Sequence, residues 1–481
     1  MKNMLKYIIK IQGGKIMKEE LLDKKENGWK EIDEGRKNEI FEFCKGYMDF
    51  LGKAKIEREF VGEARKMAEE HGFRDVNNCE HLNPGDRVYF VNREKSMYLA
   101  VIGNEKMENG IHIIGSHIDS PRLDLKPNPL HEDHGFAYLK THYYGGIKKY
   151  QWTTIPLSMH GVIVKLNGEK INVNIGEDEN DPIFTITDLL PHLAQEQMEK
   201  KLKNGVEGEN LQLLVGSIPL KSENGEEIKE AVKLNILNIL NEKYGITERD
   251  FVSSEIEIVP AFKPRSLGFD GGLVAAYGQD DKVCAYTSLK AMMELENVQK
   301  TAVCILSDKE EIGSMGNTGM ESHMFDYFVS ELLNKTGENR VNLLDKVFCY
   351  SKMLSSDVDA GFDPLYASVS DAKNAGYLGK GISLNKYTGA RGKSGASDAN
   401  AEFVAWIRNM LEENWIKFQV AELGKVDIGG GGTIAYILAN KGVDVIDCGV
   451  PVLSMHAPYE VTSKYDIFEA YRTYKAFWQR G

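Results

Sequence analysis

Short apolar runs rich in β-branched residues recur along this chain of 481 residues, and each gives way to a polar loop. A run that is apolar at every position is typical of a strand buried on both faces of a sheet. Where such strands alternate with helices, they build a parallel or mixed sheet covered by helices. The clearest runs are "MYLAVIG" (97–103), "GIHIIGSHIDS" (110–120), "TAVCIL" (301–306) and "VDVIDCGVPVLSMH" (443–456). The predicted fold class is therefore α/β, with a mixed sheet covered by helices.

A different pattern interrupts the α/β region. Within "GVIVKLNGEKINVNIGE" (161–177), apolar and polar residues alternate on both sides of Asn167-Gly168, a dipeptide typical of tight β-hairpins. Strands that alternate in this way are antiparallel, with one face exposed. We therefore predict a β-rich inserted domain over residues 126–255, which divides the α/β domain into residues 17–125 and 256–481.

Composition and charge exclude several classes of protein. The formal net charge of -13 opposes binding to nucleic acid phosphates, and no basic patch offsets it. We also predict no membrane association, because no stretch approaches the ~20 apolar residues of a membrane-spanning helix. Six cysteines without paired or metal-ligand spacing indicate buried thiols in a reducing compartment.

The first residues, "MKNMLKYIIKIQGGKIMKEE", are basic and partly apolar, so they were compared with a signal peptide. Lysines interrupt the apolar run and no small-residue cleavage pattern follows. We expect residues 1–16 to be a disordered arm or an upstream start, and the protein to be cytoplasmic.

Acidic residues and histidines gather where the predicted α/β strands end. Imidazole with carboxylate is a ligand set that suits zinc, and oxygen-rich variants accept cobalt or manganese. A site with two metals needs a bridging carboxylate and further ligands for each ion, and this set supplies that number. The residues are His117, Asp119, Asp280, Asp281, Glu310, Glu311, Asp357 and His456.

The spacing of His117 and Asp119 adds a second argument for a metal centre. Two residues apart on a strand, both side chains lie on one face, where the aspartate can accept the second N–H of the imidazole. Taken singly, each residue of the set has a simpler explanation as a turn or cap residue. Asp281 could be an acidic residue in a first helical turn, and "GGGGT" (429–433) is better explained as a tight turn than as a phosphate site. The hypothesis depends on the combination.

Five segments occur in the order shown by the aspartyl aminopeptidase family, with the insertion in the same place: "GSHIDSPRLDLKP", "YGQDDKVCAYTSL", "SDKEEIGSMG", "SSDVDAGFDP" and "SMHAPYE". The chain resembles that family of dinuclear zinc metallo-aminopeptidases from about residue 30 to its end. The resemblance implies two divalent metals per chain, zinc first, that activate a water to remove N-terminal residues from peptides. One metal would be held by His117, Asp280 and Asp357 and the other by Asp280, Glu311 and His456. Glu310 would be the general base.

The resemblance also implies assembly into a large homo-oligomer, typically a dodecamer, with the insertion as the dimerisation or assembly domain. His192, in "LLPHLAQEQ", corresponds to a histidine that reaches the active site of a neighbouring subunit. The family name implies a preference for N-terminal Asp or Glu, for which Arg391 and Lys393 are the candidate substrate-binding residues. Ala360 and Asp363 stand where relatives carry histidines, and Asp281 stands where they carry asparagine, so we expect a broader substrate range.

Three other functions stay open. A dinuclear deacylase would use the same ligands but fail on unblocked peptides, and an endo-acting hydrolase would ignore the N-terminus. A non-enzymatic assembly protein would keep the fold without the chemistry, which the intact ligand set disfavours.

Overall fold

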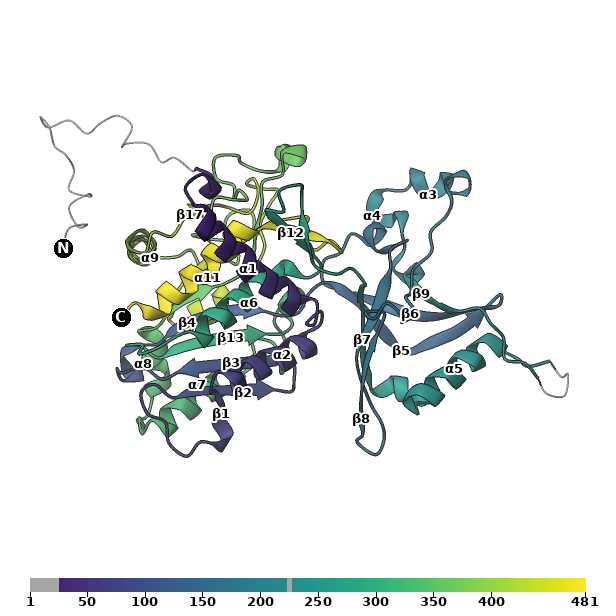
Figure 1. The fold of residues 1–481 in the computed structure, drawn as a ribbon, viewed down its shortest axis with the longest axis horizontal. Helices are drawn as coiled ribbons and strands as arrows, with labels where there is room; N and C mark the ends of the chain where they lie inside the picture. The colour runs from purple at the N-terminus through teal and green to yellow at the C-terminus, as the bar shows by residue number, and fades with distance from the viewer. Residues whose placement is uncertain (1–25, 223–226) are drawn as a thin grey trace, which may run out of the picture.

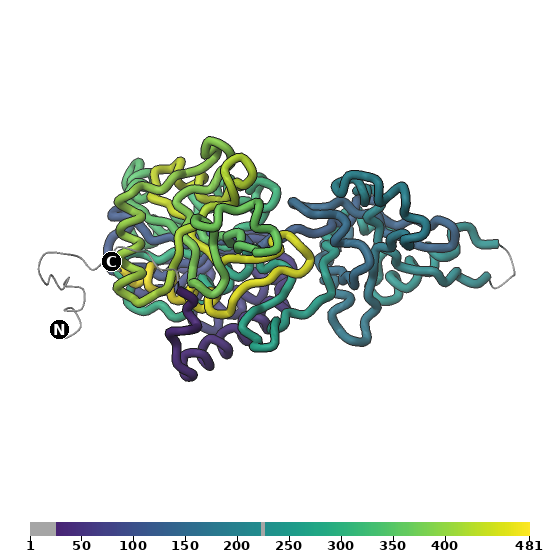
Figure 2. The backbone as a smooth tube through the Cα atoms, turned by 90° about the horizontal axis from the view of Figure 1, so that it is seen from above, coloured from purple at the N-terminus to yellow at the C-terminus, as the bar shows by residue number. Residues whose placement is uncertain are grey.

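The computed structural model describes residues 26–222 and 227–481, so the predicted arm over residues 1–16 lies outside the described residues. The chain forms two masses side by side, and Figure 2 shows the narrow connection between them. The larger mass contains the first and the last residues that the structure describes, and the smaller one is built from the middle of the chain (Figure 1).

A nine-stranded mixed sheet forms the centre of the larger mass, with the order β1-β2-β3-β13-β4-β14-β18-β16-β17. Its middle strands β13, β4, β14 and β18 are mutually parallel, so their carboxyl ends meet at one edge. This confirms the predicted α/β class. The strands are β1 (Arg74–Asp75), β2 (Arg87–Asn92), β3 (Ser96–Val101), β4 (His112–His117), β13 (Ala302–Ser307), β14 (Lys352–Ser355), β16 (Ile382–Asn385), β17 (Phe418–Val420) and β18 (Asp444–Gly449).

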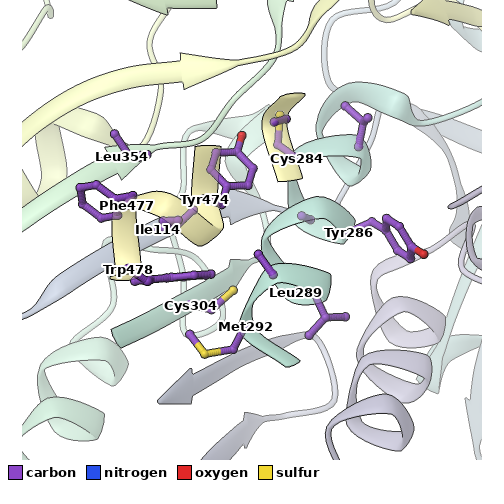
Figure 3. Close-up of a cluster of buried hydrophobic side chains, with 14 of the residues drawn as sticks. Ile114, Cys284, Tyr286, Leu289, Met292, Cys304, Leu354, Tyr474, Phe477 and Trp478 are labelled. Atoms are coloured by element: carbon purple, nitrogen blue, oxygen red, sulfur yellow. The ribbon is translucent and has the colours of Figure 1, made fainter. Parts of the chain in front are cut away.

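Helices cover both faces of this sheet, which explains why β13 is apolar from Ala302 to Leu306. In β13, Cys304 and Leu306 join the core under one set of helices, while Val303 and Ile305 join the core on the other face. Figure 3 shows the first core, where Trp478 packs near Ile114 and Cys304. The helices on that face are α1 (Glu34–Leu51), α2 (Glu57–Glu70), α6 (Gln279–Met293), α9 (Ala401–Glu413) and α11 (Lys464–Gln479); the other face carries α7 (Met324–Lys335), α8 (Leu343–Cys349) and α10 (Ala435–Ala439).

A five-stranded sheet beside the main one carries two of the site's segments, with the order β11-β12-β20-β19-β15. Its strands are β11 (Arg265–Leu267), β12 (Leu273–Ala276), β15 (Asp359–Ala360), β19 (Pro451–Leu453) and β20 (Glu460–Ser463). The chain leaves β12 directly into α6, and it leaves β19 into the loop that contains His456.

The smaller mass is a six-stranded antiparallel sheet with the order β8-β7-β10-β5-β6-β9. The predicted hairpin at Asn167-Gly168 is confirmed, because β7 and β8 pair from Met159–Ile175 to Val164–Lys170. The strands are β5 (Arg122–Asp133), β6 (Phe136–Tyr144), β7 (Leu157–Val164), β8 (Lys170–Ile175), β9 (Gln212–Gly216) and β10 (Ser254–Pro260), with helices α3 (Gln195–Glu199), α4 (Leu202–Gly205) and α5 (Ala231–Tyr244). The division of the chain at residues 126 and 255 stays a prediction.

Two expectations from composition can be compared with the structure. Five of the six cysteines are buried thiols, but Cys349 is exposed at the end of α8, so the prediction was wrong for that residue. Within residues 26–222 and 227–481, no helix is long and apolar enough to cross a membrane. The cytoplasmic location stays a prediction.

Candidate metal centre

The residues singled out at the strand ends converge on the carboxyl edge of the nine-stranded sheet. His117 is the last residue of β4, and Glu310 follows β13 in a short 3-10 helix. Asp357 comes directly after β14. Asp280 stands at the start of α6, and His456 lies in the loop after β19. Segments distant in sequence thus meet because parallel strands end at one edge, the usual place for sites in open α/β sheets.

Asp280 lies between the two histidines. Its Oδ1 is 3.2 Å from His117 Nε2, and its Oδ2 is 3.2 Å from His456 Nε2. Asp357 Oδ1 lies 3.8 Å from His117 Nε2, and Glu311 Oε2 lies 3.6 Å from His456 Nε2. Two groups result, His117–Asp280–Asp357 and Asp280–Glu311–His456, whose ligand atoms lie within 4.8 Å of one another in each. A carboxylate with one oxygen in each group has the arrangement of a ligand that bridges two metals.

Asp119 lies behind the cluster and is completely buried. Its Oδ1 is 3.3 Å from His117 Nδ1, the ring nitrogen that faces away from Asp280. The same carboxylate accepts the backbone N–H of Glu310 at 3.1 Å and that of Glu311 at 3.2 Å. Asp119 therefore orients one imidazole and fixes the backbone of both glutamates, as second partners of metal ligands commonly do.

Burial among like charges changes the acidity of the carboxyl groups. Burial raises the pKa of Glu310 to about 7, and the charges of neighbouring carboxylates act in the same direction. Burial also raises the pKa of Glu311 and Asp357 well above the ordinary range. A set of carboxyl groups that resist ionisation in this way needs cations, or protons, to offset their mutual repulsion.

A further observation agrees with a pair of divalent cations held by these residues. Glu311 Oε1 is buried and has no hydrogen-bond partner within the described part of the chain. A buried carboxylate oxygen without a partner is costly, and a cation removes that cost. Histidine nitrogens with carboxylate oxygens are a donor set that zinc accepts.

A cavity of about 430 Å³ opens over the cluster. The five candidate ligands and Glu310 line it, together with Gly430, Gly431 and Gly432 of the "GGGGT" segment. The residues that line it, all described by the structure, include no lysine or arginine. The cavity is therefore acidic.

Three of the predicted site residues, His192, Arg391 and Lys393, line other cavities. His192 is exposed in a 3-10 helix (Pro191–Leu193) of the smaller mass and lines a different cavity of about 890 Å³. Arg391 and Lys393 are exposed and line a third cavity of about 180 Å³, which shares Thr388 and Leu423 with the cavity over the cluster. The Lys393 ammonium lies 3.0 Å from Asp398 Oδ2.

Sequence patterns missed two residues that support the cluster. Glu460 is buried, and its two carboxylate oxygens accept the backbone N–H groups of His456 at 2.8 Å and Asp280 at 3.0 Å. Tyr144, at the end of β6, donates its hydroxyl hydrogen to Asp119 Oδ2 at 2.8 Å. Glu460 stands in the quoted "SMHAPYE" and could have been noticed, whereas nothing in the sequence near Tyr144 indicates a site.

Comparison with known proteins agrees with this geometry. The sequence model of the family described as "Aminopeptidase I zinc metalloprotease (M18)" matches residues 50–478. A probable M18 family aminopeptidase 1 from Clostridium acetobutylicum is 53% identical over 465 residues, which cover 96% of this chain and 99% of the relative.

Solved structures extend the likeness to the whole fold. The crystal structure of an M18 family aminopeptidase from Thermotoga maritima matches with a TM-score of 0.92 at 47% identity, covering 96% of this chain and 100% of that one. A more distant structure, that of the S. cerevisiae mApe1 dodecamer, matches with a TM-score of 0.73 at 20% identity over 91% of this chain and 96% of its own. The family predicted from the motifs is confirmed, and so is the metallo-aminopeptidase over the deacylase and the assembly protein. The chain belongs to the M18 family of zinc metallo-aminopeptidases.

Proposed function

We propose that this aminopeptidase holds two divalent cations, zinc in the first place, through five side chains. One ion would be held by His117, Asp280 and Asp357, and the other by Asp280, Glu311 and His456. The observation that carries this assignment is the position of Asp280, which directs one carboxylate oxygen toward each histidine at 3.2 Å. The two groups of ligand atoms, each within 4.8 Å, support it.

Glu310 is proposed as the general base. It belongs to neither group of candidate ligands, and its Oε2 stays 3.9 Å from His117 Nε2 while its side chain lines the cavity. Bound zinc ions supply Lewis-acid chemistry, lowering the pKa of water and polarising a carbonyl. Glu310 would accept the proton of the attacking water and later deliver it to the leaving amine, a role typically worth about 10²–10⁴ in rate.

The charge of the cavity favours peptides with a free N-terminus. An α-ammonium group is attracted to a cavity whose lining is acidic and, within the described chain, includes no lysine or arginine. An acidic substrate side chain would find no lysine or arginine partner among the described residues that line it. Arg391 and Lys393 belong to the neighbouring cavity, and Lys393 is already paired with Asp398. We therefore expect tolerance of several N-terminal residues, with at most a weak preference for Asp and Glu.

We further propose that the six-stranded sheet mediates assembly into a large homo-oligomer, with the dodecamer described for the distant yeast relative as the expected size. Two features of the surface support this. β8 is an edge strand with unpaired backbone groups, and such edges are usually covered. Exposed apolar side chains also gather over residues 183–202, where isolated monomers rarely expose so many together: Ile183, Leu189, Leu190, Leu193, Met198 and Leu202.

In such an assembly His192 is the residue that we expect to enter the active site of a neighbouring subunit, where an imidazole would hydrogen-bond the carbonyl oxygen of the scissile peptide. Two features support this proposal. The side chain is exposed between Leu190 and Leu193, and it does not line the cavity over its own subunit's cluster.

The experiment that tests the proposed function compares free and N-acetylated dipeptides with the purified protein before and after chelation. Hydrolysis of the free dipeptide alone, lost on chelation and restored by Zn²⁺, is expected, together with close to two metals per chain by elemental analysis. Equal hydrolysis of the acetylated peptide would contradict the role of the free N-terminus. Full activity in a metal-free preparation would contradict the metal centre.

A further inference from the structure

The base of the β5–β6 hairpin lies directly against the candidate metal ligands. β5 begins at Arg122, three residues after Asp119, and β6 ends at Tyr144, which pairs with Arg122 across the two strands. The chain then leaves the inserted sheet through Gly145 and Gly146. Both ends of this hairpin therefore lie at the site.

Two of these residues make hydrogen bonds to opposite sides of the cluster. The Tyr144 hydroxyl donates to Asp119 Oδ2 at 2.8 Å, on the side of His117. The Gly146 carbonyl oxygen lies 2.9 Å from His456 Nδ1. Because a carbonyl oxygen can only accept, Nδ1 is the donor in this contact, which leaves Nε2 as the nitrogen that would bind a metal near Asp280. That tautomer is the one a metal requires from Nε2.

The two glycines lie close to two of the candidate ligands, so a side chain there would press against them. A Cβ atom added to Gly146 would lie 3.2 Å from His456 Nδ1. One added to Gly145 would lie 3.3 Å from Glu311 Oε2, and Gly145 has a φ of +73°, which favours glycine. Substitution at either position would push a candidate ligand by a few tenths of an ångström.

Buried ion pairs fix the hairpin base in place. The Arg122 guanidinium lies 3.9 Å from the centre of the Tyr144 ring and 2.9 Å from Glu257 Oε2 in β10. It also lies 3.5 Å from Glu57 Oε2 in α2, which belongs to the larger mass. Arg122 thus ties Tyr144 to both masses at their junction, and the relative position of the two masses sets the position of the Tyr144 hydroxyl.

We propose that Tyr144, Gly145 and Gly146 are positioning residues of the metal centre, through which the inserted sheet sets the geometry of its ligands. Tyr144 acts through Asp119, which in turn holds His117 and the backbone of the two glutamates. Gly146 acts on the ring and the tautomer of His456. The inference rests on the ligand roles proposed above.

Tyr144→Phe and Gly146→Ala test the proposal in the full-length protein. Tyr144→Phe keeps the ring under Arg122 and removes only the hydroxyl, so we expect kcat to fall about 10-fold or more while KM stays within about twofold. Gly146→Ala should weaken Zn²⁺ binding about 10-fold or more, measured by competition with a chromophoric chelator, and excess Zn²⁺ should restore most of its kcat.

Two variants on the same hairpin serve as controls. Tyr143→Phe removes an exposed hydroxyl from the preceding position, and Gly135→Ala places a side chain at φ +78° in the turn at the far end, where nothing lies within 4 Å. If Tyr144→Phe matches Tyr143→Phe in kcat, and Gly146→Ala matches Gly135→Ala in Zn²⁺ affinity, the proposal is overturned. Lower thermal stability without either change would overturn it too. His456→Ala separates this failure from failure of the ligand assignment, because unchanged Zn²⁺ affinity in that variant would refute the assignment itself.

Discussion

Glu310 and Glu311 are adjacent in sequence, and we expect the same substitution to affect them differently. Glu310→Gln should abolish turnover and leave both metals bound, because Glu310 stands outside both groups of ligand atoms. Glu311→Gln should deplete at least one metal, because Glu311 Oε2 lies 3.6 Å from His456 Nε2 and Oε1 is buried without a protein partner in the described chain. Glutamine keeps the size of the side chain and removes the charge, so each variant isolates the chemistry.

The magnitudes follow from the two roles. Loss of a general base costs about 10²–10⁴ in kcat, equivalent to about 3–5 kcal/mol in the activation barrier. Replacing a ligand carboxylate by an amide should weaken metal binding by at least about 100-fold, since even the outer partners of metal ligands are worth about 10–100-fold. Glu310→Gln should therefore lower kcat at constant metal content, whereas Glu311→Gln should first lower the metal content.

The assay is equilibrium dialysis against a buffered Zn²⁺ series, followed by elemental analysis, with kcat measured at each Zn²⁺ concentration. Excess Zn²⁺ should rescue part of the activity of Glu311→Gln and none of that of Glu310→Gln. If both variants retain two metals and lose activity equally, or if Glu310→Gln remains active, the division of roles is wrong. The pH profile adds a check. Burial raises the pKa of Glu310 to about 7 in the metal-free chain, and nearby cations would lower it. The apparent pKa of the acid limb of kcat/KM should therefore lie below 7.

Three further predictions concern the subunit contact, substrate choice and pH. His192→Phe should lose activity with assembly intact, and mixing it with inactive Glu310→Gln subunits should restore some activity; absence of rescue after reassembly would place His192 outside a neighbour's site. For Lys393→Ala we expect little change in the relative kcat/KM values for peptides that begin with Asp, Glu, Leu or Lys. Strict selectivity for Asp and Glu in the unmodified enzyme would contradict the broad substrate range. Loss of such selectivity in Lys393→Ala would make Lys393 the residue that reads the charge. Burial raises the pKa of Asp447 to about 6, as it raises that of Glu310, so in the metal-free protein the folded state binds more protons than the unfolded state between about pH 4 and 7. Its free energy of unfolding should fall as pH rises through that window, by about 3 kcal/mol per group at most, and denaturant titrations that show a rise would refute the sign.

The strands, and the candidate site residues at their ends, could be predicted from the sequence because the signals are local. Within "TAVCIL", Ala302 to Leu306 are all apolar because β13 is buried on both faces, and Asn167-Gly168 predicts its hairpin through turn geometry alone. His117, Glu310 and Asp357 could be grouped because each follows a strand, and parallel strands end at one edge. Periodicity and strand ends are properties of short segments.

The supporting contacts could not be obtained in the same way, because they depend on how two masses of the molecule meet. Tyr144 lies in an antiparallel strand whose own pattern predicts only a half-exposed residue, yet its hydroxyl reaches Asp119. The role of Lys393 in reading substrate charge stays a prediction, since its ammonium lies 3.0 Å from Asp398 Oδ2 and the residue lines a cavity adjacent to the one over the cluster. Such contacts depend on tertiary structure, which no local pattern predicts.

The geometry around Asp119 explains how two neighbouring glutamates can take separate parts in one centre. Asp119 Oδ1 accepts the N–H of Glu310, and Oδ2 accepts the N–H of Glu311. Both backbone positions are therefore fixed by one buried carboxylate, in a 3-10 turn instead of a strand. From there Glu310 extends toward His117 and the cavity, and Glu311 extends toward His456. Because one carboxylate holds both backbone N–H groups, a change in Asp119 should disturb the proposed base and the proposed ligand together, whereas a side-chain change in either glutamate should disturb only its own side.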